Sequence, residues 1–210
     1  MAKIKTVLFT GGEVHDWKSV GDGMEEALEA AGDFELTRVD NDLSALEAPH
    51  LDPYDLIAWF FTVGELTDVQ KNGLLNFVAS GKGWAGVHSA ADSFRNCPEY
   101  RAMVGGHFVT HPAYRDYQVS IVDPEHPITE GLTEFTVRDE QYILDYDPRV
   151  HVLASALWKG TAMPVAWIKP WGKGRVFYLA LGHDGPSAQH EMFRLLLQRG
   201  ARWAGTAPEK

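Results

Sequence analysis

Histidine is the residue type in this chain best suited to chemistry, and five of its nine copies lie beside glycine-rich or turn segments. These five are His15, His88, His107, His111 and His183. Free imidazole titrates at about pH 6.5 and is a common metal ligand. Histidines gathered at one place can therefore act as acids, bases or ligands of a divalent ion, and this pattern indicates such a site.

His88 follows a short apolar run, residues 84–87, and precedes small residues that are typical of a helix start. This spacing resembles that of a nucleophile elbow, in which a sharp, strained turn lifts one side chain into the site. Because the residue is histidine, serine or cysteine acyl-enzyme chemistry is not available at this position. A cation is disfavoured beside a helix N-terminus, so we expect a neutral imidazole that hydrogen-bonds or binds a metal. A purely structural histidine is the alternative.

His107 and His111 are four residues apart, which predicts that they share one face whether the segment is helical or extended. Two side chains so placed can hold zinc or a similar divalent ion, with His88, His183 or a carboxylate as the third ligand. Loop histidines that only form hydrogen bonds are the alternative. The acidic string at residues 139–142 adds Glu140, which could serve as a base or ligand or could simply lie in an exposed turn.

Strand and helix patterns alternate through the first half of the chain. The expected strands are residues 4–10, 34–39, 56–62 and 84–87, and the expected helices are residues 19–31 and 68–79. This alternation predicts a mainly parallel sheet, with the N-terminal strand central and helices on both faces. Ligands bind at the carboxyl ends of such strands, so we expect His15, His88, His107 and His183 to share one pocket there.

The second half of the chain changes character, because strand patterns follow one another without helices. We expect strands at residues 117–122, 150–157, 164–168 and 175–179, and a C-terminal helix over residues 188–203. The turn at residues 169–174 should join the last two strands as an antiparallel hairpin. The sequence contains no repeat and no linker, which predicts one domain over residues 1–210.

Composition and charge narrow the classes of function. The chain has 210 residues, of which 45% are hydrophobic, and such a chain buries enough surface to fold without disulfides or a structural metal. A net charge of -10 disfavours nucleic acid and membrane surfaces as partners. The single cysteine, Cys97, and the short N-terminal apolar run fit a cytoplasmic protein. No GxGxxG motif follows the first strand, so we expect no nucleotide cofactor.

Several motifs occur in one order along nearly the whole chain: GGEVHDW, GVHSAADSF, YRAMVGGHFVTHP, HPITEGL, DEQY, GKGRVFYLALGHD and RGARWA. Together they resemble the ThuA-like family of trehalose utilisation. The resemblance implies an α/β fold of the class I glutamine amidotransferase-like type, a flavodoxin-like three-layer sandwich with a mainly parallel central sheet, to which the hairpin is added. In that superfamily the elbow carries a nucleophilic cysteine. Here it carries His88, so we do not expect glutaminase activity.

The resemblance also implies a role in the catabolism of trehalose and related disaccharides, in a route that passes through a 3-keto sugar. A 3-keto group acidifies the neighbouring C–H, and hydrolysis, elimination or isomerisation then needs a base and an electrophile. The residues expected to provide them are His15, His88, His183 and Glu140 as catalytic groups, Asp16, Ser89, Tyr142 and Asp184 as sugar contacts, and His107 and His111 as metal ligands.

The alternative is a protein that binds a carbohydrate or a partner without catalysis, because it has lost the nucleophile of the superfamily. The sequence leaves the oligomeric state open, including a homo-oligomer.

Overall fold

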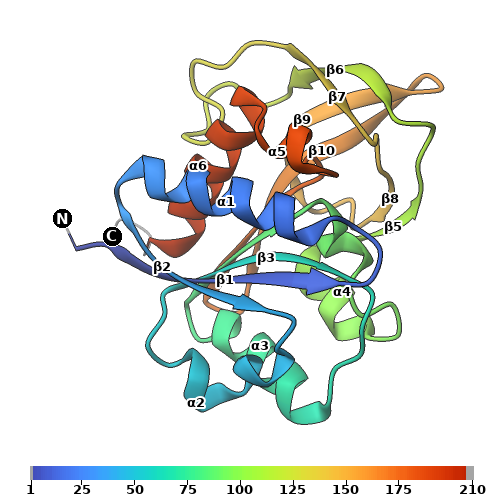
Figure 1. Cartoon of the computed structure of the whole chain (residues 1–210). Coiled ribbons are helices and arrows are strands. Elements are labelled where there is room, and N and C mark those ends of the chain that lie inside the picture. The colour runs from blue at the N-terminus through green and yellow to red at the C-terminus, as the bar shows by residue number, and fades with distance from the viewer. Residues whose placement is uncertain (1, 207–210) are drawn as a thin grey trace.

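A computed structural model describes residues 2–206 as an α/β fold built on a large sheet (Figure 1). The sheet has nine strands in the order β2-β1-β3-β4-β11-β10-β9-β6-β7. Their bounds are β1 Ile4–Gly12, β2 Phe34–Asp40, β3 Leu56–Thr62, β4 Gly83–Val87, β6 Arg115–Ile121, β7 Phe135–Asp139, β9 His151–Trp158, β10 Thr161–Trp171 and β11 Gly174–Leu179. A separate two-stranded sheet pairs β5 (Gly106–Thr110) with β8 (Ile143–Tyr146).

The helices follow the order α1 Trp17–Ala31, α2 Ala48–Leu51, α3 Asp68–Ala79, α4 Pro98–Val104, α5 Gly185–Ala188 and α6 Glu191–Gly205, with short 3-10 turns η1 Leu43–Leu46 and η2 His88–Asp92. Helices α1 and α6 lie on one face of the strands β1 and β3, and α2 and α3 lie on the other (Figure 1). Among the described residues, no helix is both long enough and apolar enough to cross a membrane.

The sheet is mixed, so the expectation of a mainly parallel sheet is wrong. Strands β2, β1, β3, β4 and β11 pair in parallel, whereas β11, β10, β9, β6 and β7 pair antiparallel. Strand β1 is second from an edge and not central. The physical reason is that the second half lacks crossover helices, and short connections join strands antiparallel. The predicted hairpin is confirmed, since β10 and β11 pair up to Trp171 opposite Gly174.

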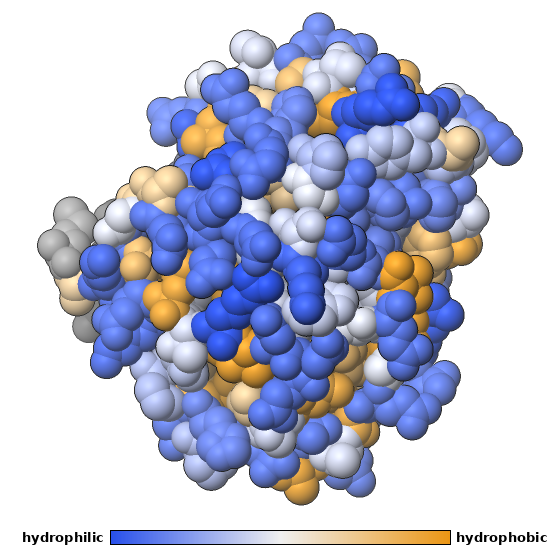
Figure 2. All heavy atoms as spheres, in the orientation of Figure 1, coloured by the Kyte–Doolittle hydropathy of each residue, from blue (hydrophilic) through white to orange (hydrophobic). Residues whose placement is uncertain are grey.

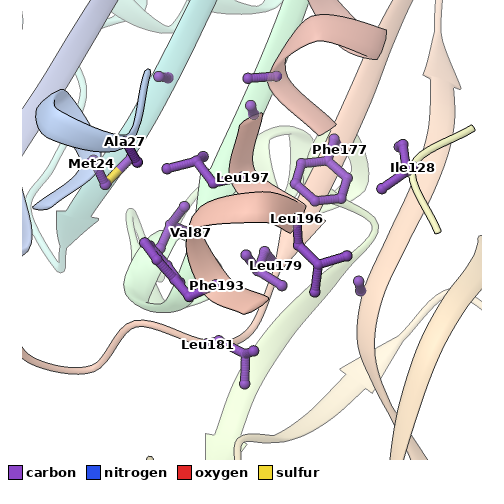
Figure 3. Close-up of a cluster of buried hydrophobic side chains, with 14 of the residues drawn as sticks. Met24, Ala27, Val87, Ile128, Phe177, Leu179, Leu181, Phe193, Leu196 and Leu197 are labelled. Carbon is purple, nitrogen blue, oxygen red and sulfur yellow. The ribbon is translucent and has the colours of Figure 1, made fainter. Parts of the chain in front are cut away.

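Alternation along the buried strands builds a core on each face of the sheet. In β3, Ala58 and Phe60 pack in the core under α1 and α6, while Ile57 and Trp59 pack in the core on the α3 side. The first core is shown in Figure 3, where Leu196 and other side chains of α6 lie over those of β11. A strand buried on both faces reads as a continuous apolar run, which is why β3 is found at the predicted residues.

The helix predicted at residues 68–79 is confirmed as α3. Thr67 accepts a hydrogen bond from the backbone of Gln70, and the Gln70 side chain accepts one from the backbone of Thr67. This reciprocal capping box satisfies two backbone donors that the first helical turn leaves free. In contrast, the sequence patterns do not predict strands β5, β7 and β8. Strand β7 matters for the site, because Glu140 follows it directly.

The outer surface is mostly polar in the view of Figure 2, where hydrophobic residues are scattered between hydrophilic ones. Large hydrophobic side chains exposed among the described residues include Val14, Val69 and Leu157, which lie far apart in the sequence. Single exposed apolar residues of this kind are ordinary in globular proteins.

Candidate functional site

Four chemically competent side chains meet at one point, although they come from four separate segments of the chain. His15 follows β1, His88 follows β4, Glu140 follows β7 and His183 follows β11. Each offers one donor atom, and these atoms all lie within 4.8 Å of one another. We call this group the His3Glu cluster. The structure thus brings together the four residues expected to be catalytic, while their role remains a prediction.

His88 occupies the strained turn that the sequence predicts. Its φ is 43°, in the left-handed region, where a non-glycine residue costs about 1–3 kcal/mol unless the surroundings fix it. The Nδ1–H donates to the carbonyl oxygen of Ala180 at 2.9 Å, and the hydroxyl of Tyr178 donates to the His88 carbonyl at 2.8 Å. Because Nδ1 donates to Ala180, Nε2 is the nitrogen that faces the cluster, and it is buried with no hydrogen-bond partner among residues 2–206.

The other two histidines pack edge-on against His88 and each other. The His15 ring centroid lies 5.2 Å from that of His88 and 5.1 Å from that of His183. Nδ1 of His15 lies 2.8 Å from the hydroxyl of Thr62, at the end of β3. Nδ1 of His183 lies 3.0 Å from Oε2 of Glu140, which is 3.5 Å from Nε2 of His88. Three imidazoles and one carboxylate therefore face a common centre.

The electrostatics of the cluster favour the protonation states that metal ligands need at His15 and Glu140, whereas His183 would lose a proton on binding a metal. Burial and the neighbouring His88 and His183 lower the pKa of His15 to about 3, so this ring is neutral at pH 7. Burial acts to raise the pKa of Glu140, but His183 and His88 outweigh it and hold the pKa well below its usual range. Burial acts to lower the pKa of His183, yet the Glu140 carboxylate raises it. Ionised Glu140 and neutral His15 are ready to bind a cation.

The lowered pKa of His15 predicts that the metal-free protein loses stability in acid. The folded-state pKa of about 3 lies below the unfolded value of 6.5, so the unfolded chain takes up this proton first as the pH falls. The free energy of unfolding should therefore decrease between pH 6.5 and 3 through this residue. Allowing for the partial exposure of the ring, we expect the contribution to be on the order of 1–3 kcal/mol.

Urea denaturation in the presence of EDTA at pH 4.5 and 7.5 measures this effect. The His15→Gln variant should lose less stability than the wild type between the two pH values. Equal losses in the two proteins would mean that His15 is not protected from protonation in the fold.

Tyr142 and Ser89, two of the residues expected to contact a sugar, are buried behind His88. The Tyr142 ring packs on the His88 ring with centroids 3.9 Å apart. Both residues are buried, and the Ser89 hydroxyl has no hydrogen-bond partner among the described residues. These buried positions are better suited to supporting the His88 ring than to contacting a sugar.

Asp16 and Asp184, the other two expected sugar contacts, cap helices. Asp16 accepts a hydrogen bond from the backbone of Ser19 at the start of α1. Asp184 caps α5 and lies 3.3 Å from the hydroxyl of Tyr114, whose ring centroid is 5.6 Å from that of His183. Asp184 and Tyr114 are both partly exposed beside the cluster, so they remain candidates for contact with a ligand.

The structure groups His111, but not His107, with the His3Glu cluster. Nδ1 of His111 lies 3.5 Å from Oε1 of Glu140, at the exposed rim of the site. His107 lies instead 3.9 Å from the carboxylate of Asp145 on β8. A bulge in β5 between these histidines shifts the register. The extra residue changes the alternation of side chains, so a spacing of four no longer places both on one face.

Asp139 is a residue whose importance the sequence did not reveal. Its carboxylate accepts hydrogen bonds from the backbone N–H of Gly182 at 2.7 Å and of His183 at 3.2 Å. These bonds fasten the end of β7 to the loop after β11 and so hold Glu140 beside His183. Burial raises the pKa of Asp139, but the backbone donors oppose this shift. The acidic string was visible in the sequence, whereas its long-range partners were not.

Fold and site together define an α/β protein with a partly buried histidine–carboxylate centre at one edge of its sheet. A family model described as ThuA, trehalose utilisation, matches residues 5–204. The chain belongs to the ThuA family. No curated protein matches it in sequence.

Solved structures share the fold over nearly the whole chain. A putative ThuA-like protein from Parabacteroides merdae is 23% identical with a TM-score of 0.88, and the match covers 99% of this chain and 92% of that one. A cytoplasmic protein from Salmonella typhimurium LT2 is 15% identical with a TM-score of 0.69, and the match covers 95% of this chain and 99% of that one.

A β-galactosidase from Bacillus circulans sp. alkalophilus also matches, with a TM-score of 0.63 at 13% identity. This match covers 92% of the present chain but 30% of the β-galactosidase. At such low identity these likenesses show the fold alone.

Proposed function

We propose that this protein is an enzyme of carbohydrate catabolism that acts on a disaccharide or related sugar carrying a keto group, assisted by a divalent metal ion. The ThuA family supports a role in sugar metabolism. The observation that carries the metal is the His3Glu cluster, with its four donor atoms within 4.8 Å. Buried polar atoms are rarely left without a partner, and a bound ion would supply the partner that Nε2 of His88 lacks.

The donor set narrows the choice of ion. Three imidazole nitrogens and one carboxylate oxygen suit zinc and other divalent transition metals, whereas magnesium and calcium prefer oxygen ligands alone. The surrounding groups fix the ligands, since Ala180 orients His88 and Thr62 contacts His15. When bound, such an ion polarises a substrate oxygen and stabilises negative charge that develops on it.

We propose that His111, which the sequence suggested as a metal ligand, instead moves a proton. The three histidines of the His3Glu cluster face inward, while the His111 side chain is 37% exposed at the rim. In the proposed reaction this imidazole takes the proton from the C–H group beside the substrate carbonyl, and the ionised Glu140 stabilises the imidazolium that forms. The proton then returns to the sugar in an isomerisation, or to the departing oxygen in an elimination. Hydrolysis would use the same groups to activate water.

We further infer that the fold is a variant of the class I glutamine amidotransferase-like type. Strand β4 leads directly into the strained turn at His88, where that superfamily places its nucleophile. An imidazole in place of the nucleophilic cysteine argues against glutaminase activity. The Salmonella relative described as cytoplasmic and the single cysteine support a cytoplasmic location for this protein.

The test is elemental analysis of protein purified without a histidine tag or chelator, followed by assays on 3-keto-disaccharides. We expect close to one equivalent of a transition metal per chain, and turnover that EDTA removes and the same metal restores. Full activity of metal-free protein would contradict the metal centre. Sugar binding without turnover would favour a binding protein that has lost catalysis.

A further inference from the structure

A second polar site lies away from the His3Glu cluster, where Arg101 of α4 and His107 of β5 line two neighbouring cavities. The first cavity, of about 220 Å³, is also lined by Asp92, Arg95 and Phe108. The second cavity, of about 280 Å³, lies against Gly105, Gly106 and the residues Asp145–Asp147. Arg101 and His107 are the residues common to both cavities.

Arg101 lacks the counter-ion that its neighbour has. Arg95 forms a two-pronged ion pair with Asp92, with N–O distances of 2.7 and 2.8 Å. Within residues 2–206, no carboxylate comes close enough to pair with the Arg101 guanidinium, and its Nε is buried without a hydrogen-bond partner. A desolvated guanidinium donor without an acceptor costs free energy, which an oxyanion in the cavity would recover.

The acidic groups near this site leave the Arg101 charge free. Asp92 is engaged by Arg95, and Asp147 is engaged by Arg149 at 2.8 Å. Asp145 is 73% exposed and lies 3.9 Å from Nε2 of His107. The first cavity, lined by two arginines and one carboxylate, carries a positive charge in a protein of net charge -10, and this points to an anionic ligand there.

Two aromatic rings separate this site from the His3Glu cluster. Phe108 lines the first cavity and packs on Tyr142 with centroids 4.5 Å apart, and Tyr142 packs in turn on His88 at 3.9 Å. A ligand held by Arg101 would therefore not also be a ligand of the metal. We propose that Arg101, with His107, forms a binding site for a small oxyanion, a carboxylate or a phosphate group, distinct from the metal centre.

Nuclear magnetic resonance of the Arg101 Nε–H group in the full chain tests this site, with sodium phosphate and sodium gluconate as separate probes. The signal is identified by its loss in the Arg101→Lys variant. We expect a saturable shift with at least one probe, and the probe that binds more tightly identifies phosphate or carboxylate as the preferred group. Arg101→Lys, which keeps the charge but loses the planar fork, should bind about tenfold more weakly or worse by calorimetry.

Two matched variants distinguish anion binding at Arg101 from binding at an exposed arginine or at the His3Glu cluster. Arg202→Gln removes a partly exposed arginine that pairs with Asp33 and lines neither cavity, so it should leave anion affinity unchanged. His183→Ala disrupts the His3Glu cluster and should also leave it unchanged, so failure of the proposed function would not affect the result. Absence of a saturable shift with both probes, equal affinity in Arg101→Lys, or loss of anion binding in His183→Ala would each overturn the oxyanion site.

Discussion

Replacing His183 by alanine is expected to abolish metal retention and turnover while leaving the fold intact. His183 is partly exposed in the loop after β11 and contributes one of four converging donor atoms, so its loss removes a ligand without emptying the core. Even changes to groups that merely orient metal ligands cost about 10–100-fold in affinity. We therefore expect more than about 100-fold weaker metal binding, measured by competition with a chromophoric chelator.

The matched control is His107→Ala, which removes a histidine of the GGHFVTHP segment. Because His107 lies against Asp145 and outside the His3Glu cluster, this variant should retain its metal. Metal loss in His107→Ala with retention in His183→Ala would restore the sequence-based prediction that His107 and His111 hold the ion. Circular dichroism of both variants checks that neither result reflects unfolding.

Replacing Gly73 by alanine should destabilise the protein, although alanine is the better helix former. Gly73 lies inside α3, where alanine is normally worth about 1 kcal/mol over glycine. Here an added Cβ would lie 2.0 Å from the carbonyl oxygen of Leu46 and 3.1 Å from the backbone nitrogen of Ala48. Overpacking against rigid backbone costs about 1–3 kcal/mol or more, so we expect a net loss of about 2 kcal/mol in the free energy of unfolding.

Asn72→Ala provides the comparison, because Asn72 is the exposed neighbour in the same helix. This substitution should stabilise the protein by a few tenths of a kcal/mol through helix propensity alone. Urea denaturation of both variants at pH 7.5 shows whether each substitution raises or lowers the free energy of unfolding. A stabilised Gly73→Ala protein would show that α3 does not pack closely on the Leu46 segment.

The sequence by itself determined the elements whose signals are local. Strand β3 and helix α3 fall on the predicted residues, because a run of buried apolar residues and a capping box each depend on a few adjacent positions. The turn at His88 and the hairpin between β10 and β11 were recognisable for the same reason. Glycine adopts a positive φ at no steric cost and proline fixes φ, so turn signals of this kind act locally.

Only the tertiary structure decided which of these elements meet. The sheet became mixed because strands without crossover helices pair antiparallel, and no short window of sequence records that choice. Glu140 lies beside the histidines because the neighbouring Asp139 carboxylate accepts hydrogen bonds from the backbone of Gly182 and His183, which are 43 and 44 residues further along the chain. A single bulge in β5 separated His107 from His111. A one-residue change of register moves side chains to the opposite face, so the membership of the site depends on pairings across the whole chain.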